Sequence, residues 1–244
     1  MIVMGCNRSQ SNVTEVRNDL VVDSTEAINE NDSFTVVYRQ PVNGYKVKAV
    51  VKSDQLYVVN YADITFNKNG TSFTLNTTSF GDSLFNKGGW GMDGTNDIFI
   101  KKYRHKIVDA DYHVHKEKDR MMPRYTPFFF MDLDFDGIEE LVIVHLSMGD
   151  RYHDEFDVYR IVDDKPVLIN YPPYKIGNDR MTDYPDFDYR KKTIDCPYPE
   201  GPGGLGFEGH KIYGVSKKQK DTVVINGKQH LFNYMEEIQD VKYD

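Results

Sequence analysis

The chain is poor in the residues that mark several common protein classes. It holds two cysteines, Cys6 and Cys196, in 244 residues, which excludes a disulfide scaffold. No stretch approaches the roughly 20 apolar residues of a transmembrane helix. There is no long basic run and the formal net charge is −8, so we expect no nucleic-acid partner. Neither Gly-x-Ser-x-Gly nor His-Glu-x-x-His occurs, so two common hydrolase motifs are missing.

What the chain does have is aromatic residues and a period of two. The 17 Tyr and 14 Phe residues supply enough apolar area for a core, although the mean hydropathy is −0.59. Apolar side chains alternate with polar ones over Phe34–Tyr38 and again over Tyr45–Val51. Such alternation predicts half-buried strands. Between the two runs stands Asn43-Gly44, the strongest short signal for a hairpin.

Similar turn signals recur along the chain, at Asn69-Gly70, Asp163-Asp164 and Asn226-Gly227. This density of hairpins predicts an all-β fold, mainly antiparallel, built as a meander or a two-sheet β-sandwich. We expect one or two short helices, at Ser79–Asn86 and Tyr234–Asp240. We also expect two long irregular loops, at 80–96 and 170–209, because glycine and proline concentrate there.

The N-terminal residues differ in composition from the rest. Val3–Cys6 resembles the end of a bacterial lipoprotein signal peptide, in which a small residue precedes the cysteine that becomes lipidated. The resemblance implies a lipid anchor on Cys6 and a place in the cell envelope, on the periplasmic or cell-surface face. A methionine start with a chance Gly-Cys pair is the alternative. We expect residues 1–32 to be a signal remnant and flexible tether, and residues 33–244 to form one β-rich domain with a possible sub-boundary near 104–124.

The sharpest chemical signal is the acidic run from Asp132 to Glu140. Asp132, Asp134 and Asp136 match positions 1, 3 and 5 of the 12-residue calcium loop, the backbone carbonyl of Ile138 matches position 7, and Glu140 matches position 9. Gly137 permits the sharp turn. Neighbouring carboxylates repel one another, so solvent, a basic side chain or a cation must offset their charge. We predict that the cation is Ca²⁺ and that its role is structural.

The flanks of this loop are strand-like rather than helical, and no glutamate stands at position 12. The run therefore resembles the Asp-x-Asp-x-Asp-Gly calcium loops of extracellular β-proteins, here in a single copy. With the Cys6 start, the chain resembles envelope lipoproteins of the Bacteroidetes type. Phe187–Ile194 is similar to later strands of periplasmic β-sandwich proteins of the lysozyme-inhibitor type. These resemblances imply an extracytoplasmic binding protein.

Other candidate sites carry weaker signals. Trp90 among glycines, Asp93, Tyr174 and Tyr184 are candidate binding residues in the two long loops. His113 and His115 fall two residues apart, as zinc ligands on one strand face would, but exposed histidines are the commoner reading. We favour a binding module for a protein or glycan partner over an enzyme. The alternative is a glycan-directed hydrolase that uses loop carboxylates such as Asp93 and Asp97.

Overall fold

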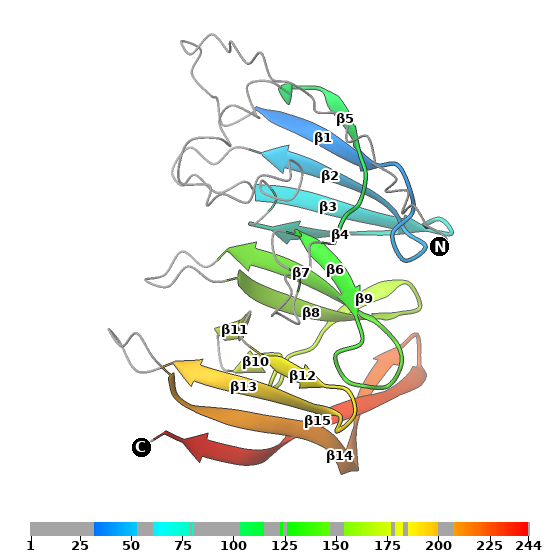
Figure 1. Cartoon of the computed structure of the whole chain (residues 1–244). Coiled ribbons are helices and arrows are strands. Elements are labelled where there is room, and N and C mark those ends of the chain that lie inside the picture. The colour runs from blue at the N-terminus through cyan, green and yellow to red at the C-terminus, as the bar shows by residue number, and fades with distance from the viewer. Residues whose placement is uncertain are drawn as a thin grey trace, which may run out of the picture.

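The protein is described here from a computed structural model that covers residues 32–52, 61–78, 80, 103–114, 123, 126–146, 154–176, 179–182, 185–199 and 207–243. Figure 1 shows three sheets stacked along the long axis of the molecule. Nearly all pairings are antiparallel. The prediction of an all-β, mainly antiparallel fold is therefore confirmed, with three sheets in place of the two expected.

The first sheet has the order β4-β3-β2-β1-β5, and β5 runs parallel to β1. Its strands are β1 (Ser33–Tyr38), β2 (Lys46–Lys52), β3 (Tyr61–Lys68), β4 (Thr71–Thr77) and β5 (Ile107–Ala110). Alternate residues on β1, β2 and β3 are buried, which confirms the half-buried strands read from the sequence.

The four hairpin turns lie where the sequence places them. In each turn both central residues have positive φ, as at Asn43 (48°) with Gly44 (79°) and at Asp163 (50°) with Asp164 (58°). Two-residue turns of this kind match the right-handed twist of the flanking strands. Asparagine, aspartate and glycine are the residues that adopt these angles at little cost, so local sequence alone specifies the turns.

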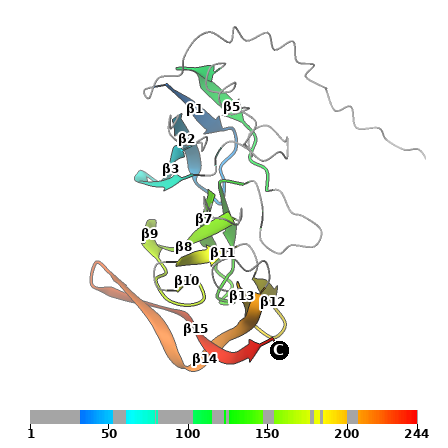
Figure 2. The same ribbon diagram turned by 90° about the vertical axis from the view of Figure 1, so that its left-hand side faces the viewer.

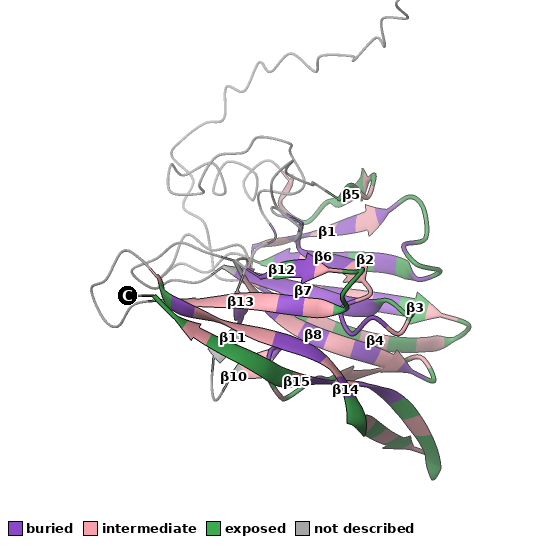
Figure 3. Ribbon diagram, turned by 60° about the horizontal axis from the view of Figure 1, so that its bottom comes forward, coloured by how far each residue is buried: buried purple, intermediate pink, exposed green. Residues whose placement is uncertain are grey.

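The second sheet lies in the middle of the molecule, and its central strands contribute side chains to a core on each face. It consists of β6 (Phe128–Met131), β7 (Glu140–Leu146), β8 (Asp154–Val162), β9 (Lys165–Leu168), β10 (Lys175–Ile176) and β11 (Asp179–Thr182). Phe128 and Ile143 pack into a core with the first sheet, whereas Phe129 and Val142 pack into a core with the third. Figure 3 shows continuous burial along β7 and an alternation of buried and intermediate residues along β8.

The third sheet has the order β12-β13-β14-β15. Its strands are β12 (Asp186–Asp188), β13 (Thr193–Pro199), β14 (Phe207–Ile225) and β15 (Lys228–Lys242). β14 and β15 form a hairpin whose tip projects beyond the rest of the sheet (Figure 2). The pairing of β14 with β15 changes register between Val215 and Lys220, so the strand pairs on the two sides of this point are shifted relative to each other.

Two sequence-based expectations are wrong here. Tyr234–Asp240 is not helical but part of β15, because it pairs with Lys211–Val215 of β14 and this pairing overrides local helix propensity. The region 170–209 is not one irregular loop, since it contributes strands β10 to β13. Buried Met181, Phe187 and Ile194 draw these short strands onto the second core. Of the helix expected at Ser79–Asn86, only Phe80 is described.

Candidate metal centre

The loop between β6 and β7 brings three aspartates together. One oxygen from each of Asp132, Asp134 and Asp136 lies within 4.8 Å of the others. Asp134 is fully buried, whereas Asp132 and Asp136 are half-buried. Carboxylate oxygens are the donors that hard cations prefer, so this group could hold a metal ion.

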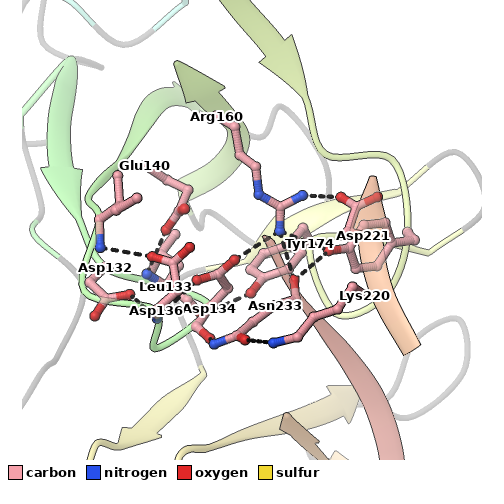
Figure 4. Close-up of polar contacts among 12 residues, drawn as sticks. Asp132, Leu133, Asp134, Asp136, Glu140, Arg160, Tyr174, Lys220, Asp221 and Asn233 are labelled. Carbon is pink, nitrogen blue, oxygen red and sulfur yellow. Dashed lines mark hydrogen bonds and ion pairs between the residues drawn. The ribbon is translucent and has the colours of Figure 1, made fainter. Parts of the chain in front are cut away.

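Backbone amides of the loop itself orient these carboxylates (Figure 4). The Asp136 N–H donates to Asp132 Oδ1 at 3.2 Å and to Asp134 Oδ1 at 3.1 Å. The Gly137 N–H donates to Asp132 Oδ2 at 3.1 Å. These bonds need a tightly curled backbone, with φ of 62° at Phe135 and 89° at Gly137. The alternating aspartates and the glycine therefore fold the loop onto its own side chains.

Aromatic rings fix the inner side of the loop. Phe135 is 4% exposed and packs against Phe187 and Tyr189, with ring centroids at 6.5 and 5.2 Å. Tyr174 is 2% exposed, and its hydroxyl donates to the Leu133 carbonyl oxygen at 2.8 Å. The expectation of Tyr174 as an exposed binding residue is therefore wrong. Its ring belongs to the same buried cluster as Leu133 and Phe135, so it packs on the inner side of the loop.

Glu140 stands apart from the three aspartates. It opens β7, is 2% exposed, and its carboxylate accepts a hydrogen bond from the Leu133 N–H at 2.7 Å. Burial, followed by the charge of Asp134, raises the Glu140 pKa to about 9. The group of converging carboxylates contains the three aspartates and does not include Glu140. The side chain of Ile138, whose carbonyl was the fourth expected ligand, is exposed.

A buried arginine reaches the loop from β8. Arg160 is 2% exposed and donates to Asp134 Oδ2 at 2.9 Å and to Asp221 of β14. It also donates to the Tyr171 hydroxyl at 3.0 Å and to the Asn233 carbonyl oxygen at 2.9 Å. Charge-assisted bonds of this kind are the strong ones in a protein interior. Arg160 therefore ties the acidic loop to the β14–β15 hairpin.

A second link joins the same two elements. The Asn233 side-chain amide donates to the Asp134 carbonyl oxygen at 2.9 Å, and Lys220 Nζ donates to Asn233 Oδ1 at 2.6 Å. The Asp134 pKa is raised to about 6, because burial outweighs the opposing hydrogen bond and charge of Arg160. Residues some 100 positions apart thus share one polar cluster, which Figure 4 shows between the loop and the hairpin.

Arg160 was not singled out from the sequence, although a signal was present. In β8, Phe156, Val158 and Val162 occupy the inward positions of a strand with period two, and Arg160 falls on the same face. A charged residue on a buried strand face needs a buried partner of opposite charge. That rule points to an acid nearby without saying which one.

The charge of the cluster remains negative. Three carboxylates converge in the loop, and the one guanidinium that reaches them among the described residues is shared with Asp221. Lys192 Nζ approaches the loop only at the Phe135 carbonyl oxygen, at 3.1 Å. The side chains that the structure describes thus offset the repulsion among Asp132, Asp134 and Asp136 only in part, which fits the binding of a divalent cation.

The remaining candidate residues are quickly placed. Cys6, Trp90, Asp93, Tyr184, His115 and Asp97 lie outside the described residues. His113 is exposed and follows the end of β5, so it does not lie on a strand. Within the described ranges, the three loop aspartates form the one group of histidine, cysteine or acidic side chains close enough to share a metal.

Comparisons with known proteins find no counterpart: no protein-family model, no curated protein and no solved structure matches the chain. Across the residues that the structure describes, no helix has the length and apolar character needed to span a bilayer.

Proposed function

We propose that residues 132–140 bind Ca²⁺ as a structural ion, and that the protein is a non-catalytic binding module of the bacterial cell envelope. The observation that carries the metal site is the convergence of Asp132, Asp134 and Asp136 within 4.8 Å, with their orientation set by loop amides. Ca²⁺ takes six to eight oxygen ligands, so the Ile138 carbonyl and water would complete the set.

The position of the loop supports a structural role. It joins β6 to β7 in the central sheet, and through Arg160 and Asn233 it contacts the β14–β15 hairpin of the third sheet. An ion that is bound only by the folded loop would stabilise this junction. Extracellular calcium modules bind at about 10⁻⁴–10⁻³ M, so an envelope address makes such weak binding sufficient.

The test is calorimetric titration with Ca²⁺ and with Mg²⁺. Asp132→Asn and Asp136→Asn are better probes than Asp134→Ala, because loss of the Asp134 carboxylate also leaves Arg160 without a buried partner. We expect a Kd of about 10⁻⁴–10⁻³ M for Ca²⁺ in the wild type. The Kd should rise by roughly tenfold or more in each variant, because one charged ligand is lost.

A matched control is Asp109→Asn, which makes the same change of charge on exposed β5 in the first sheet. Thermal melts should rise with Ca²⁺ in the wild type and the control, and much less in the two loop variants. Equal heats of Ca²⁺ binding in all four proteins would refute the site.

A further inference from the structure

An open cleft of about 660 Å³ lies beside the acidic loop. Its wall includes Gly137, Ile138 and Glu139, the outer part of that loop. The β1–β2 turn at Asn43, the end of β3 at Lys68 and the β8–β9 turn also line it. These turns lie on the same side of the molecule, at the right of Figure 1. The volume falls in the range of small-ligand sites.

The cleft combines an apolar surface with acidic side chains. Phe130 and Ile161 contribute partly buried apolar side chains, and Ile138 is 58% exposed. Three carboxylates line the same space, those of Glu139, Asp163 and Asp164, against a single lysine. An apolar surface with an excess of negative charge matches a cation carried on an apolar stem.

Lys68 shows this chemistry within the protein. Its Nζ lies 4.9 Å from the centroid of the Tyr45 ring and 3.6 Å from Asp164 Oδ1. The Tyr45 hydroxyl donates to the same carboxylate oxygen at 2.9 Å. One part of the cleft is thus already a cation site that the chain fills with its own ammonium group.

The other two carboxylates have weaker partners. Asn43 Nδ2 donates to Glu139 Oε2 at the long distance of 3.4 Å, and His230 Nε2 lies 3.7 Å from Asp163 Oδ2. Among the described residues, no lysine or arginine forms an ion pair with either acid. Within the described part of the chain, both acids therefore face the cleft without a lysine or arginine partner.

A neutral sugar fits this cleft less well. Sugar rings stack on open aromatic faces, and the Tyr45 ring offers none, because it is 3% exposed. Phe130 stacks on it, with centroids 6.1 Å apart and planes 6° apart, and Lys68 lies over the ring as well. Charge is thus the property by which this cleft would select a ligand.

We propose that the cleft binds an arginine side chain of a basic partner polypeptide. Glu139 and Asp163 would bind the guanidinium, and Ile138, Phe130 and Ile161 would contact its methylene stem and the neighbouring apolar residue. A guanidinium suits this arrangement because its planar array of donors can serve two carboxylates at once. The net charge of −8 would speed association with a basic partner. The proposal rests on the proposed role as a binding module and names its partner chemistry.

The experiment uses the full chain in Ca²⁺-containing buffer and two labelled peptides, Gly-Leu-Arg-Leu-Gly and the same peptide with citrulline for arginine. Citrulline keeps the shape and removes the charge. Fluorescence anisotropy should show that the arginine peptide binds. The citrulline peptide should bind more weakly by roughly tenfold or more, because it has lost the charge that strengthens hydrogen bonds to carboxylates.

Glu139→Gln and Asp163→Asn should each lower the affinity for the arginine peptide about tenfold, whereas Asp109→Asn on β5 should leave that affinity unchanged. The two variants lie on different elements, so a folding defect in one, detected by its melting curve, leaves the other as the test. Equal binding of the two peptides, no binding at all, or no effect of a folded variant would overturn the proposal. A separate Ca²⁺ titration of the same samples shows whether the loop binds the ion. A failure of the cleft proposal can therefore be distinguished from a failure of the proposed metal site.

Discussion

Replacing Arg160 by methionine tests the polar cluster that joins the loop to the hairpin. Methionine keeps an unbranched stem against Phe232, over whose ring the guanidinium lies at 4.6 Å. The change leaves the Asp134 carboxylate, with 0% of its side chain exposed, without its cation. The second partner, Asp221, is 25% exposed and can be solvated instead, so most of the cost falls on Asp134.

Removal of one partner of a buried ion pair costs about 3–5 kcal/mol, because the remaining charge has neither water nor a counter-ion. In a protein of this length 1 kcal/mol lowers the Tm by about 2–4 °C, so the expected loss is roughly 6–20 °C. Urea and thermal unfolding in chelator would measure both values. Asp134→Asn in the Arg160→Met background should recover most of the loss, because it removes the unpaired charge.

The stabilisation by Ca²⁺ should differ between the wild type and Arg160→Met. At 10 mM Ca²⁺ and a Kd of about 10⁻⁴–10⁻³ M, binding adds roughly 1.4–2.7 kcal/mol to the stability of the folded state. The gain should be larger for Arg160→Met than for the wild type, since the ion then offsets the Asp134 charge by itself. A loss below about 1 kcal/mol in chelator, or no recovery in the double variant, would refute the role given to Arg160.

Three further predictions concern the loop and the one described cysteine. Gly137→Ala should lower stability by about 1–2 kcal/mol in urea unfolding, because its φ is 89° although no atom crowds the position; an unchanged midpoint would contradict this. In chelator, the free energy of unfolding should fall as pH rises from 4.5 to about 9, because folded Glu140 retains a proton that the unfolded chain releases. Glu140→Gln should flatten that dependence, and an equal slope in both proteins would count against the buried acid. Cys196 should react slowly with iodoacetamide in the native state and rapidly in urea, as followed by mass spectrometry, because burial raises its thiol pKa. Fast labelling of Cys196 in the native state would contradict this prediction, because it would show a thiol accessible to solvent.

The parts of the fold that were predicted correctly depend on local sequence. The turns at Asn43-Gly44 and Asp163-Asp164 need positive φ, and a few residue types supply it cheaply. The strands follow from the alternation of apolar and polar residues. The convergence of the loop aspartates is local as well, since their hydrogen bonds span two to five positions.

The parts that were missed depend on distant pairing. Tyr234–Asp240 contains good helix formers, but its backbone hydrogen bonds with β14 stabilise it as a strand. Tyr174 lies in a region rich in proline, yet the second core buries its ring. Nothing in the sequence says that a strand from one region will cover a given face.

The sequence by itself determined where the chain turns, which segments are extended, and that three aspartates would gather between two strands. Tertiary structure alone decided that Arg160 and Asn233 reach Asp134, and that Glu140 turns to the Leu133 amide. It also brought two hairpin turns, the end of β3 and the acidic loop to one open cleft. The physical reason is range. Backbone angles and side-chain alternation act within a few residues, whereas burial and charge pairing depend on which sheets stack against each other.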